Sequence, residues 1–309
     1  MALPQDFLDL AKHVNNWGRW GEDDERGTLN LITEDAVRRA GELVRDGRAF
    51  SLSIPFSESG PQTGGIPGRV NPERSMIAVN APLSRDAEGV RFNDDVVTMG
   101  LQAATHWDSL AHVTYDGRMY NGFDLGASID ARGASRCGID KVGVLVSRGV
   151  LLDVARAREV ERLEGGYAIT FDDLVAAESL SGLAVEPGDV VLVRTGQMQL
   201  FHGRELKAYG RPSPGLSMET VRWFHERDVA AVATDNMTFE VFPVERDDCA
   251  FPVHMLLLVE MGLLQGQNFD LEALSADCEE DGVYEFLLEA SPLPFERGLG
   301  GPVNPVAVK

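Results

Sequence analysis

Apolar residues follow one another along this chain in short runs that alternate with amphipathic segments. Continuous apolar runs of about four to eight residues are typical of buried strands, and apolar residues three and four positions apart are typical of helices. This pattern predicts strands at Phe50–Pro55, Met76–Val79, Val96–Met99, Gly143–Val146, Val150–Val154, Val190–Val193, Val229–Ala233 and Val283–Glu289, and helices at residues 33–45, 170–177, 217–227 and 251–264.

The alternation of strands and helices predicts an α/β core whose strand ends carry the working groups. Arg194 and Asp235 fall at two such ends, where a pairing with each other or with a neighbouring charge is favoured over substrate contact. Arg148-Gly149 is read as a turn between two strands, and Gln267 is read as part of a loop. Residues 57–73, rich in Gly, Pro and Ser, are either a surface loop or a flap over a site.

Composition excludes several classes of partner. The 309 residues include 28 basic and 49 acidic side chains, and the net charge of −21 predicts no binding to nucleic acid or to an anionic membrane. No apolar run is long enough to span a membrane, and the first residues lack a signal-peptide pattern, so a cytoplasmic location is expected. The three widely spaced cysteines are expected to be small buried groups rather than disulfide or zinc ligands.

No internal repeat or linker interrupts the chain, which predicts a single domain over residues 1–309 with an N-terminal arm of about thirty residues. Trp17 and Trp20 lie in this arm, where packing on the domain surface is favoured over a role in a substrate pocket. Together with Trp107, they are the candidate aromatic contacts for a substrate.

The segment Gln102–His112 carries the strongest chemical signal. It reads Gln-Ala-Ala-Thr-His-Trp-Asp-Ser-Leu-Ala-His. In an extended segment His106 and Asp108 point to the same side, and a helical turn after them would bring His112 back over Asp108. Three nitrogen or oxygen ligands would then converge, as a divalent metal with an open position requires. Unrelated histidines beside a turn-forming Asp are an equally weighted alternative on spacing alone.

Other catalytic patterns are weak. The chain contains no Gly-x-Ser-x-Gly pentapeptide of a serine hydrolase and no phosphate-binding glycine motif in the right context. His254 stands alone among apolar residues of the predicted helix 251–264, where a core role is the more common one. His13, His202 and His225 are expected at the surface.

The segment Gln102–His112 resembles the metal-dependent cyclase family that includes bacterial kynurenine formamidase and isatin hydrolase. The signature of that family is His-x-Gly-Thr-His-x-Asp-x-Pro-x-His. The likeness extends over most of the chain, including residues 17–30, 188–196, 254–262 and 283–305. Thr105, His106, Asp108 and His112 match the signature, while Gln102, Ala104 and Leu110 replace its first His, its Gly and its Pro.

The resemblance implies a swivelling β/β/α domain with a central mixed sheet, assembled as a homodimer or homotetramer. It implies metal ligands at His106 and Asp108, and a second-metal or proton-carrying role for His112 and His254. A Glu ligand of the family falls on Gln267 here. Amide oxygens are weaker ligands than carboxylates or imidazoles, so Gln102 and Gln267 argue against a full two-metal site.

The resulting hypothesis is a hydrolase with one manganese or zinc ion held by His106, Asp108, Gln267 and Gln102. The ion would activate a water, and His112 or His254 would carry its proton to the leaving group. The substrate would be a small cyclic amide, a lactone or an aryl formamide. The alternatives are a metal-free cyclase or isomerase that uses the two histidines, and a non-catalytic small-molecule-binding member of the family.

Overall fold

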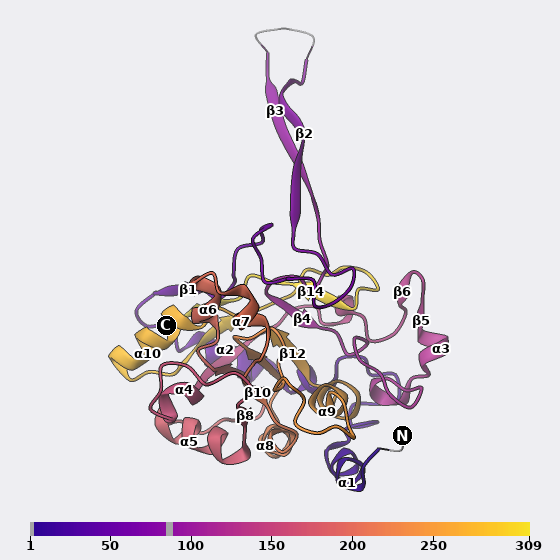
Figure 1. The fold of residues 1–309 in the computed structure, drawn as a ribbon, viewed down its shortest axis with the longest axis vertical. Helices are drawn as coiled ribbons and strands as arrows, with labels where there is room; N and C mark the ends of the chain where they lie inside the picture. Colours follow the sequence, from indigo (N-terminus) through magenta and orange to yellow (C-terminus); the bar gives the residue numbers. More distant parts are fainter. Residues whose placement is uncertain (1–2, 85–88) are drawn as a thin grey trace.

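A nine-stranded mixed sheet forms the centre of the molecule in the computed structural model, which describes residues 3–84 and 89–309 (Figure 1). Its inner strands are parallel to one another, and its outer strands are antiparallel to their neighbours. The predicted α/β class with a central mixed sheet is confirmed. The strand order is β1 (Ala49–Ser51), β15 (Val306–Val308), β13 (Glu285–Glu289), β7 (Val146–Asp153), β9 (Val190–Arg194), β11 (Ala231–Thr234), β12 (Leu264–Gln267), β4 (His106–Asp108) and β14 (Gly300–Pro302).

Both faces of the inner strands are buried, which explains their continuous apolar runs. Along β7, Leu151 packs into one apolar cluster, whereas Val150 and Leu152 pack into a second cluster on the opposite face. The first cluster contains residues of α10 (Glu272–Asp281). The second contains residues of α1 (Gln5–Val14), α5 (Phe171–Ser181) and α8 (Thr220–Glu226). The sheet is therefore the middle layer, with α1, α5 and α8 on one face and with α10 and irregular segments on the other.

Two of the predicted helix starts are supported by side-chain caps, whereas α8 begins three residues after the predicted Ser217 and has no such cap. α2 (Glu34–Gly41) begins after Thr33, whose hydroxyl accepts a hydrogen bond from Ala36 N, and α5 begins with the expected capping box at Thr170. The remaining short elements are η1 (Gly27–Leu31), η2 (Tyr120–Gly122), α3 (Leu125–Ser128), β5 (Ile129–Asp130), β6 (Gly133–Ala134), η3 (Ile139–Lys141), α4 (Val154–Ala157), β8 (Ala168–Ile169), α6 (Met198–His202), α7 (Leu206–Gly210) and β10 (Gly215–Leu216).

The predicted turn at Arg148-Gly149 is wrong, because both residues lie inside the single strand β7. Arg148 forms ion pairs with Asp189 and Glu285 and remains extended. Gly149 lies under the ring of Phe286, and a Cβ at this glycine would come 2.2 Å from a ring carbon. The glycine therefore provides space for a neighbouring ring rather than a turn.

The predicted helix over residues 251–264 is shorter and is mostly a π-helix. It consists of α9 (Pro252–His254) and η4 (Met255–Met261), and it ends at Gly262, which has a positive φ of 67°. A Cβ at Gly262 would overlap the ring of Tyr120 at 2.3 Å. The N-terminal arm packs on this segment, since Trp17 Nε1 donates to Val259 O at 2.7 Å. Across the described ranges, no helix has the length and apolar character that a membrane crossing would need.

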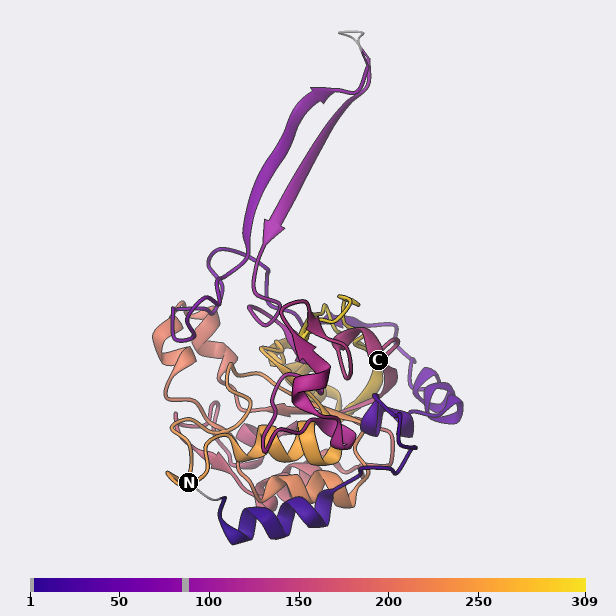
Figure 2. The same cartoon turned by 90° about the vertical axis from the view of Figure 1, so that its right-hand side faces the viewer.

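A long hairpin of β2 (Glu73–Pro82) and β3 (Arg91–Thr98) projects away from the body of the molecule (Figures 1 and 2). Every residue of β3 is exposed. Ile77 and Val79 on β2 are 64% and 68% exposed. A two-stranded ribbon without further packing is only marginally stable in water, so these exposed apolar side chains need a function beyond folding.

The substitution Gly149→Ala should destabilise the fold by about 1–3 kcal/mol, because the buried ring of Phe286 would have to shift. Gly41→Ala is the matched control, since Gly41 ends α2 with open space at its Cβ position and alanine is the better helix former. Urea unfolding followed by circular dichroism gives both free energies. Equal stability of the two variants would contradict the packing role of Gly149.

Candidate active site

The register between β4 and β12 brings the predicted ligands together. Asp108 lies opposite Gln265, and His106 lies opposite Gln267. Directly opposed residues of an antiparallel pair share one face of the sheet, so these side chains point to the same side. Gln267, which was expected in a loop, is thus the last residue of β12.

On the other edge of β4, Gly300 of β14 lies opposite Asp108. A Cβ at Gly300 would come 2.7 Å from Gln102 Nε2, so the absence of a side chain there makes room for Gln102. The amide nitrogen of Gln102 in turn lies 3.5 Å from Nδ1 of His112. This contact places Gln102 beside the carboxylate and the imidazoles of the same motif.

Asp108 is the centre of the cluster and is fully buried. Its Oδ2 accepts hydrogen bonds from Gln267 Nε2 at 2.9 Å and from Gln265 Nε2 at 3.3 Å. Its Oδ1 faces Nε2 of His106 at 3.4 Å and Nε2 of His112 at 3.6 Å. The chain leaves β4 in a turn closed by His112 N and Ser109 O at 2.9 Å, which produces the convergence that the spacing predicts.

Three buried acceptor atoms in this cluster have no hydrogen-bond partner, and they are His106 Nε2, Asp108 Oδ1 and Gln265 Oε1. His106 Nδ1 lies 2.7 Å from Ala104 O, which can only accept, so the ring proton is on Nδ1 and Nε2 carries a lone pair. Neither His106 Nε2 nor Asp108 Oδ1 forms a hydrogen bond. Two unsatisfied acceptors this close are unfavourable unless a cation lies between them. A divalent ion fits this pair of atoms.

The donor set limits the kind of metal site. Among residues 3–84 and 89–309, no three or more His, Cys, Asp and Glu side chains form a group that could hold a metal ion. The strong donors at the unsatisfied point are therefore His106 and Asp108, and the amides of Gln102, Gln265 and Gln267 lie beside this cluster. Such a set suits one ion and does not suit two.

The environment of the cluster lowers the pKa of Asp108 and the pKa of His112 for different reasons. Burial would raise the pKa of Asp108, but the imidazoles of His112 and His106 outweigh this and hold the pKa well below its usual range. Burial also lowers the pKa of His112, and the nearby Asp108 offsets this only in part. His112 is therefore neutral at pH 7 and able to accept a proton.

His254 is held by a carboxylate that the sequence did not indicate. Glu240 accepts a hydrogen bond from His254 Nδ1, and it also accepts from the backbone N–H groups of Val253 and His254 at 3.2 Å each. Burial would lower the pKa of His254, but Glu240 raises it above its ordinary value. The rings of Phe239 and Phe251 contact the imidazole edge to face. The charge of His254 also acts on Asp108 and His112.

The tryptophans do not join this cluster. Trp107 alternates with its neighbours on β4, so its fully buried side chain packs edge to face on Phe269 and donates to Ala290 O at 2.8 Å. The prediction that Trp107 contacts a substrate is therefore wrong, because its side chain belongs to the core. Trp17 is fixed on Val259 O, and Trp20 packs against the guanidinium of Arg19.

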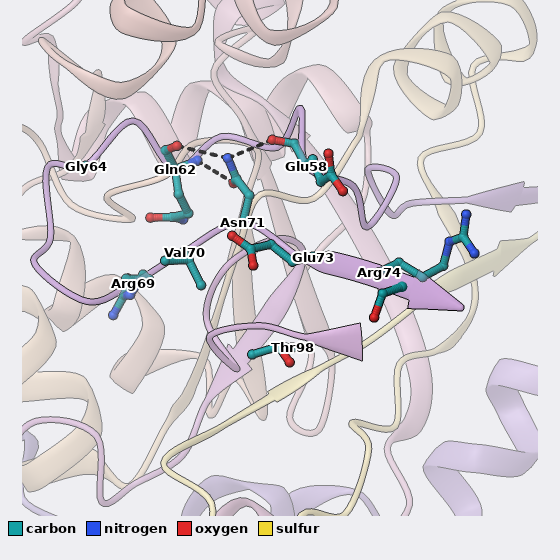
Figure 3. Close-up of a pocket in the computed structure, with 10 residues that line it drawn as sticks. Glu58, Gln62, Gly64, Arg69, Val70, Asn71, Glu73, Arg74 and Thr98 are labelled. Carbon is teal, nitrogen blue, oxygen red and sulfur yellow. Dashed lines mark hydrogen bonds between the residues drawn. The ribbon is translucent and has the colours of Figure 1, made fainter. Parts of the chain in front are cut away.

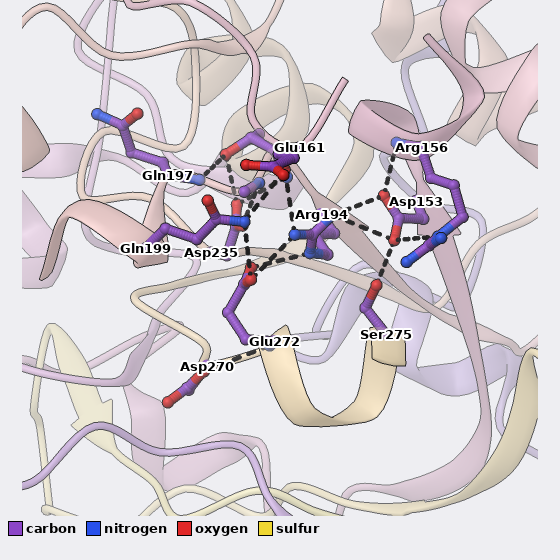
Figure 4. A network of polar contacts seen from close by, with 12 residues as sticks. Asp153, Arg156, Glu161, Arg194, Gln197, Gln199, Asp235, Asp270, Glu272 and Ser275 are labelled. Atoms are coloured by element: carbon purple, nitrogen blue, oxygen red, sulfur yellow. Dashed lines mark hydrogen bonds and ion pairs between the residues drawn. The ribbon is translucent and has the colours of Figure 1, made fainter. Parts of the chain in front are cut away.

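The charged residues at the strand ends form a structural network (Figure 4). Arg194 pairs with Asp153 and Glu272, as the favoured interpretation predicted. Asp235 accepts hydrogen bonds from Thr195 N, Thr195 Oγ1 and Gly196 N, although burial raises its pKa to about 6. All three cysteines are buried and free, as expected.

Comparison with known proteins assigns the family. A family model described as putative cyclase matches residues 50–241, which is more than half of the chain. The chain belongs to this cyclase family. No curated protein sequence matches the chain. The resemblance noted in Gln102–His112 is thereby confirmed at the level of the family.

Solved structures of this fold cover nearly all of the chain. A crystal structure described as a novel cyclase has 37% identity and a TM-score of 0.87, covering 96% of this chain and 100% of that one. Isatin hydrolase A from Labrenzia aggregata bound to benzyl benzoate has 19% identity, a TM-score of 0.63 and coverages of 84% and 93%. A predicted metal-dependent hydrolase from Bacillus stearothermophilus has 17% identity, a TM-score of 0.54 and coverages of 85% and 98%. The last two share the fold.

Glu240→Gln should lower the pKa of His254, because the carboxylate that raises it is removed. A raised pKa means that protonated His254 stabilises the fold below its ordinary pKa of 6.5, and that this contribution is lost as the pH rises through the raised value. The difference in unfolding free energy between the wild type and the variant should therefore be largest below pH 6.5. NMR titration of the His254 ring from pH 5 to 9 measures the shift, with the exposed Glu34→Gln as control. An unchanged pKa in Glu240→Gln would contradict the assignment.

Proposed function

We propose that this protein is a metal-dependent hydrolase that cleaves a C–N or C–O bond of a small cyclic amide, a lactone or an aryl formamide. The observation that carries the proposal is the pair of unsatisfied buried acceptors, His106 Nε2 and Asp108 Oδ1, 3.4 Å apart. Proteins described as isatin hydrolase and as a predicted metal-dependent hydrolase share the fold, which supports this choice of chemistry.

One Mn²⁺ or Zn²⁺ ion would be held by His106 through Nε2 and by Asp108 through Oδ1, with the amide oxygens of Gln267 and Gln102 as weaker ligands. When bound, such an ion supplies Lewis-acid activation of water and of a carbonyl group. Gln267 and Gln265 orient Asp108 by donating to Oδ2, which leaves Oδ1 free to bind a metal.

The two remaining histidines divide the proton transfers. His112 has a lowered pKa and lies beside Asp108, so it acts as the base that takes a proton from the attacking water. His254 has a pKa raised by Glu240, so its protonated form is favoured and it acts as the acid toward the leaving nitrogen or oxygen. Environments that push two pKa values apart are the usual physical basis of such a division.

Asp108→Ala should abolish retention of the metal, because it removes the only carboxylate in the proposed ligand set. Elemental analysis of protein purified without chelator measures the metal content. Asp172→Ala is the control, since Asp172 is an exposed carboxylate in the first turn of α5. Unchanged metal content in Asp108→Ala would exclude this ligand assignment. A wild type without metal would favour the metal-free cyclase or isomerase.

The activity itself is tested with metal-loaded protein on lactones, cyclic imides and aryl formamides. His112→Gln should retain the metal and lower kcat by roughly 10²- to 10⁴-fold, because a proton transfer is lost while the ligands remain. Hydrolysis of none of these compounds by the wild type would refute the enzyme and leave a small-molecule-binding protein of the same fold.

We also propose that the functional unit is a homo-oligomer joined through the hairpin of β2 and β3. The hairpin exposes apolar side chains such as Ile77 and Val79, and the body exposes Leu293 and Phe295, 54% and 45% accessible, in the loop before β14. This loop lies at the same end of the body as the hairpin root (Figures 1 and 2). In a two-fold pair, each copy could offer both surfaces to the other.

The double variant Ile77→Asp/Val79→Asp should dissociate the oligomer, because it places charges on the apolar face that would be buried. Analytical ultracentrifugation gives the mass of the wild type, expected to be that of a dimer or tetramer. Ser75→Asp, also exposed on β2, is the control for added charge on the hairpin. A monomeric wild type at tens of micromolar would disprove the assembly.

A further inference from the structure

Arg69 is a cation without a charged partner in a strongly acidic protein. It lies in the loop between β1 and β2 and is half-buried. Its guanidinium forms no ion pair or hydrogen bond with the described residues. Burial lowers the pKa of Arg69, and the charge of Asp108 offsets this lowering only in part. In contrast, Arg74, on the neighbouring hairpin, pairs with Asp95.

The loop presents Arg69 toward the cluster described above. The charge of Arg69 acts on Asp108 and His112, which lie in the segment Gln102–His112, and on His254 from a distant part of the chain. Arg69 also lines a cavity of about 650 Å³ at the root of the hairpin (Figure 3). A Cβ at Gly100 would come 3.3 Å from Arg69 Cγ, so the side chain also packs beside the backbone that leads into Gln102.

The position of Arg69 is fixed by the loop. Asn71 accepts from Gln62 N at 2.8 Å and donates to Gln62 O at 2.9 Å, and Gln62 Nε2 donates to Ala103 O at 3.0 Å. Figure 3 shows the contacts between Asn71 and Gln62. Together these hydrogen bonds anchor residues 62–71 to the segment that leads into β4. The backbone on either side of Arg69 is thus tied to this segment in the absence of a ligand.

The position of Arg69 is not explained by a need to neutralise the charge of Asp108. Asp108 already accepts two amide hydrogen bonds at Oδ2 and faces two imidazoles at Oδ1, and Arg69 does not come within ion-pair distance of it. Glu58 and Glu73 also line the cavity, but neither pairs with Arg69. A half-buried guanidinium without a counter-ion is unfavourable until an anion reaches it, and a carboxylate offers it two parallel hydrogen bonds.

We propose that Arg69 binds a carboxylate group of the substrate and so selects substrates that carry one. The inference rests on the proposed hydrolase function and deepens it, since it names the charge of the substrate. The carboxylate would sit in the cavity at the hairpin root, and the scissile carbonyl would point toward His106 and Asp108. Uncharged analogues would lose this contact and bind more weakly.

The experiment compares N-formylanthranilate, which carries a carboxylate beside its formamide, with its methyl ester. Arg69→Gln should reduce the ratio of kcat/KM for the acid over the ester by roughly 10- to 100-fold, the effect of losing a charge-assisted hydrogen bond. The change should appear mainly in KM for the acid, and Arg69→Lys should restore part of it. Arg74→Gln, at the same cavity, should keep the wild-type ratio.

The outcomes separate the inference from the function on which it rests. A wild-type ratio in Arg69→Gln would overturn the carboxylate site while hydrolysis of either compound upholds the hydrolase. If metal-loaded wild type hydrolyses neither compound, calorimetry with benzoate decides the site alone, and the hydrolase fails only if the lactones and cyclic imides are also left intact. Benzoate binding that is lost in Arg69→Gln and kept in Arg74→Gln would support the site. Equal binding by all three proteins, or none by the wild type, would overturn it.

Discussion

The pairing of β4 with β12 is the constraint on which the site depends. It sets His106 opposite Gln267 and Asp108 opposite Gln265, and it turns Trp107 into the core against Phe269. Because side chains alternate along a strand, a slip of one residue would bring Trp107 to the site and bury His106 and Asp108 in an apolar cluster. The burial of Trp107 therefore secures the register, and the register secures the ligands.

The site has a balanced set of charges in a protein of net charge −21, because the carboxylates of Asp108 and Glu240 are offset by His254 and Arg69. One buried carboxylate, Asp108, faces two imidazoles on one oxygen and two amide N–H groups on the other. A divalent ion would exceed the charge of this carboxylate, and Arg69 adds a further cation nearby. An anionic ligand is the natural complement of such a site, since the negative surface elsewhere offers it no comparable position.

The sequence predicted what is local and missed what depends on tertiary packing. His106, Asp108 and His112 lie within seven residues, so periodicity alone places them on one side. Glu240 contacts His254 from an irregular segment fourteen positions earlier, and no sequence pattern predicts that contact. Arg148-Gly149 has the composition of a turn, but the ring of Phe286 fills the space above the glycine and keeps the strand straight. The wider turns of the π-helix at Met255–Met261 likewise have no sequence signature.

The loop and the hairpin are continuous in the chain, so the proposed assembly and the proposed substrate contact would depend on each other. Arg69 precedes the first residue of β2 by only four positions, and Asn71 between them ties the hairpin root to Glu58 and Gln62. A partner that fixes the hairpin would therefore also fix the loop that presents Arg69. Since an arginine side chain loses about 2 kcal/mol of rotamer freedom when it is ordered, a loop already held by its neighbours reduces the cost of binding an anion.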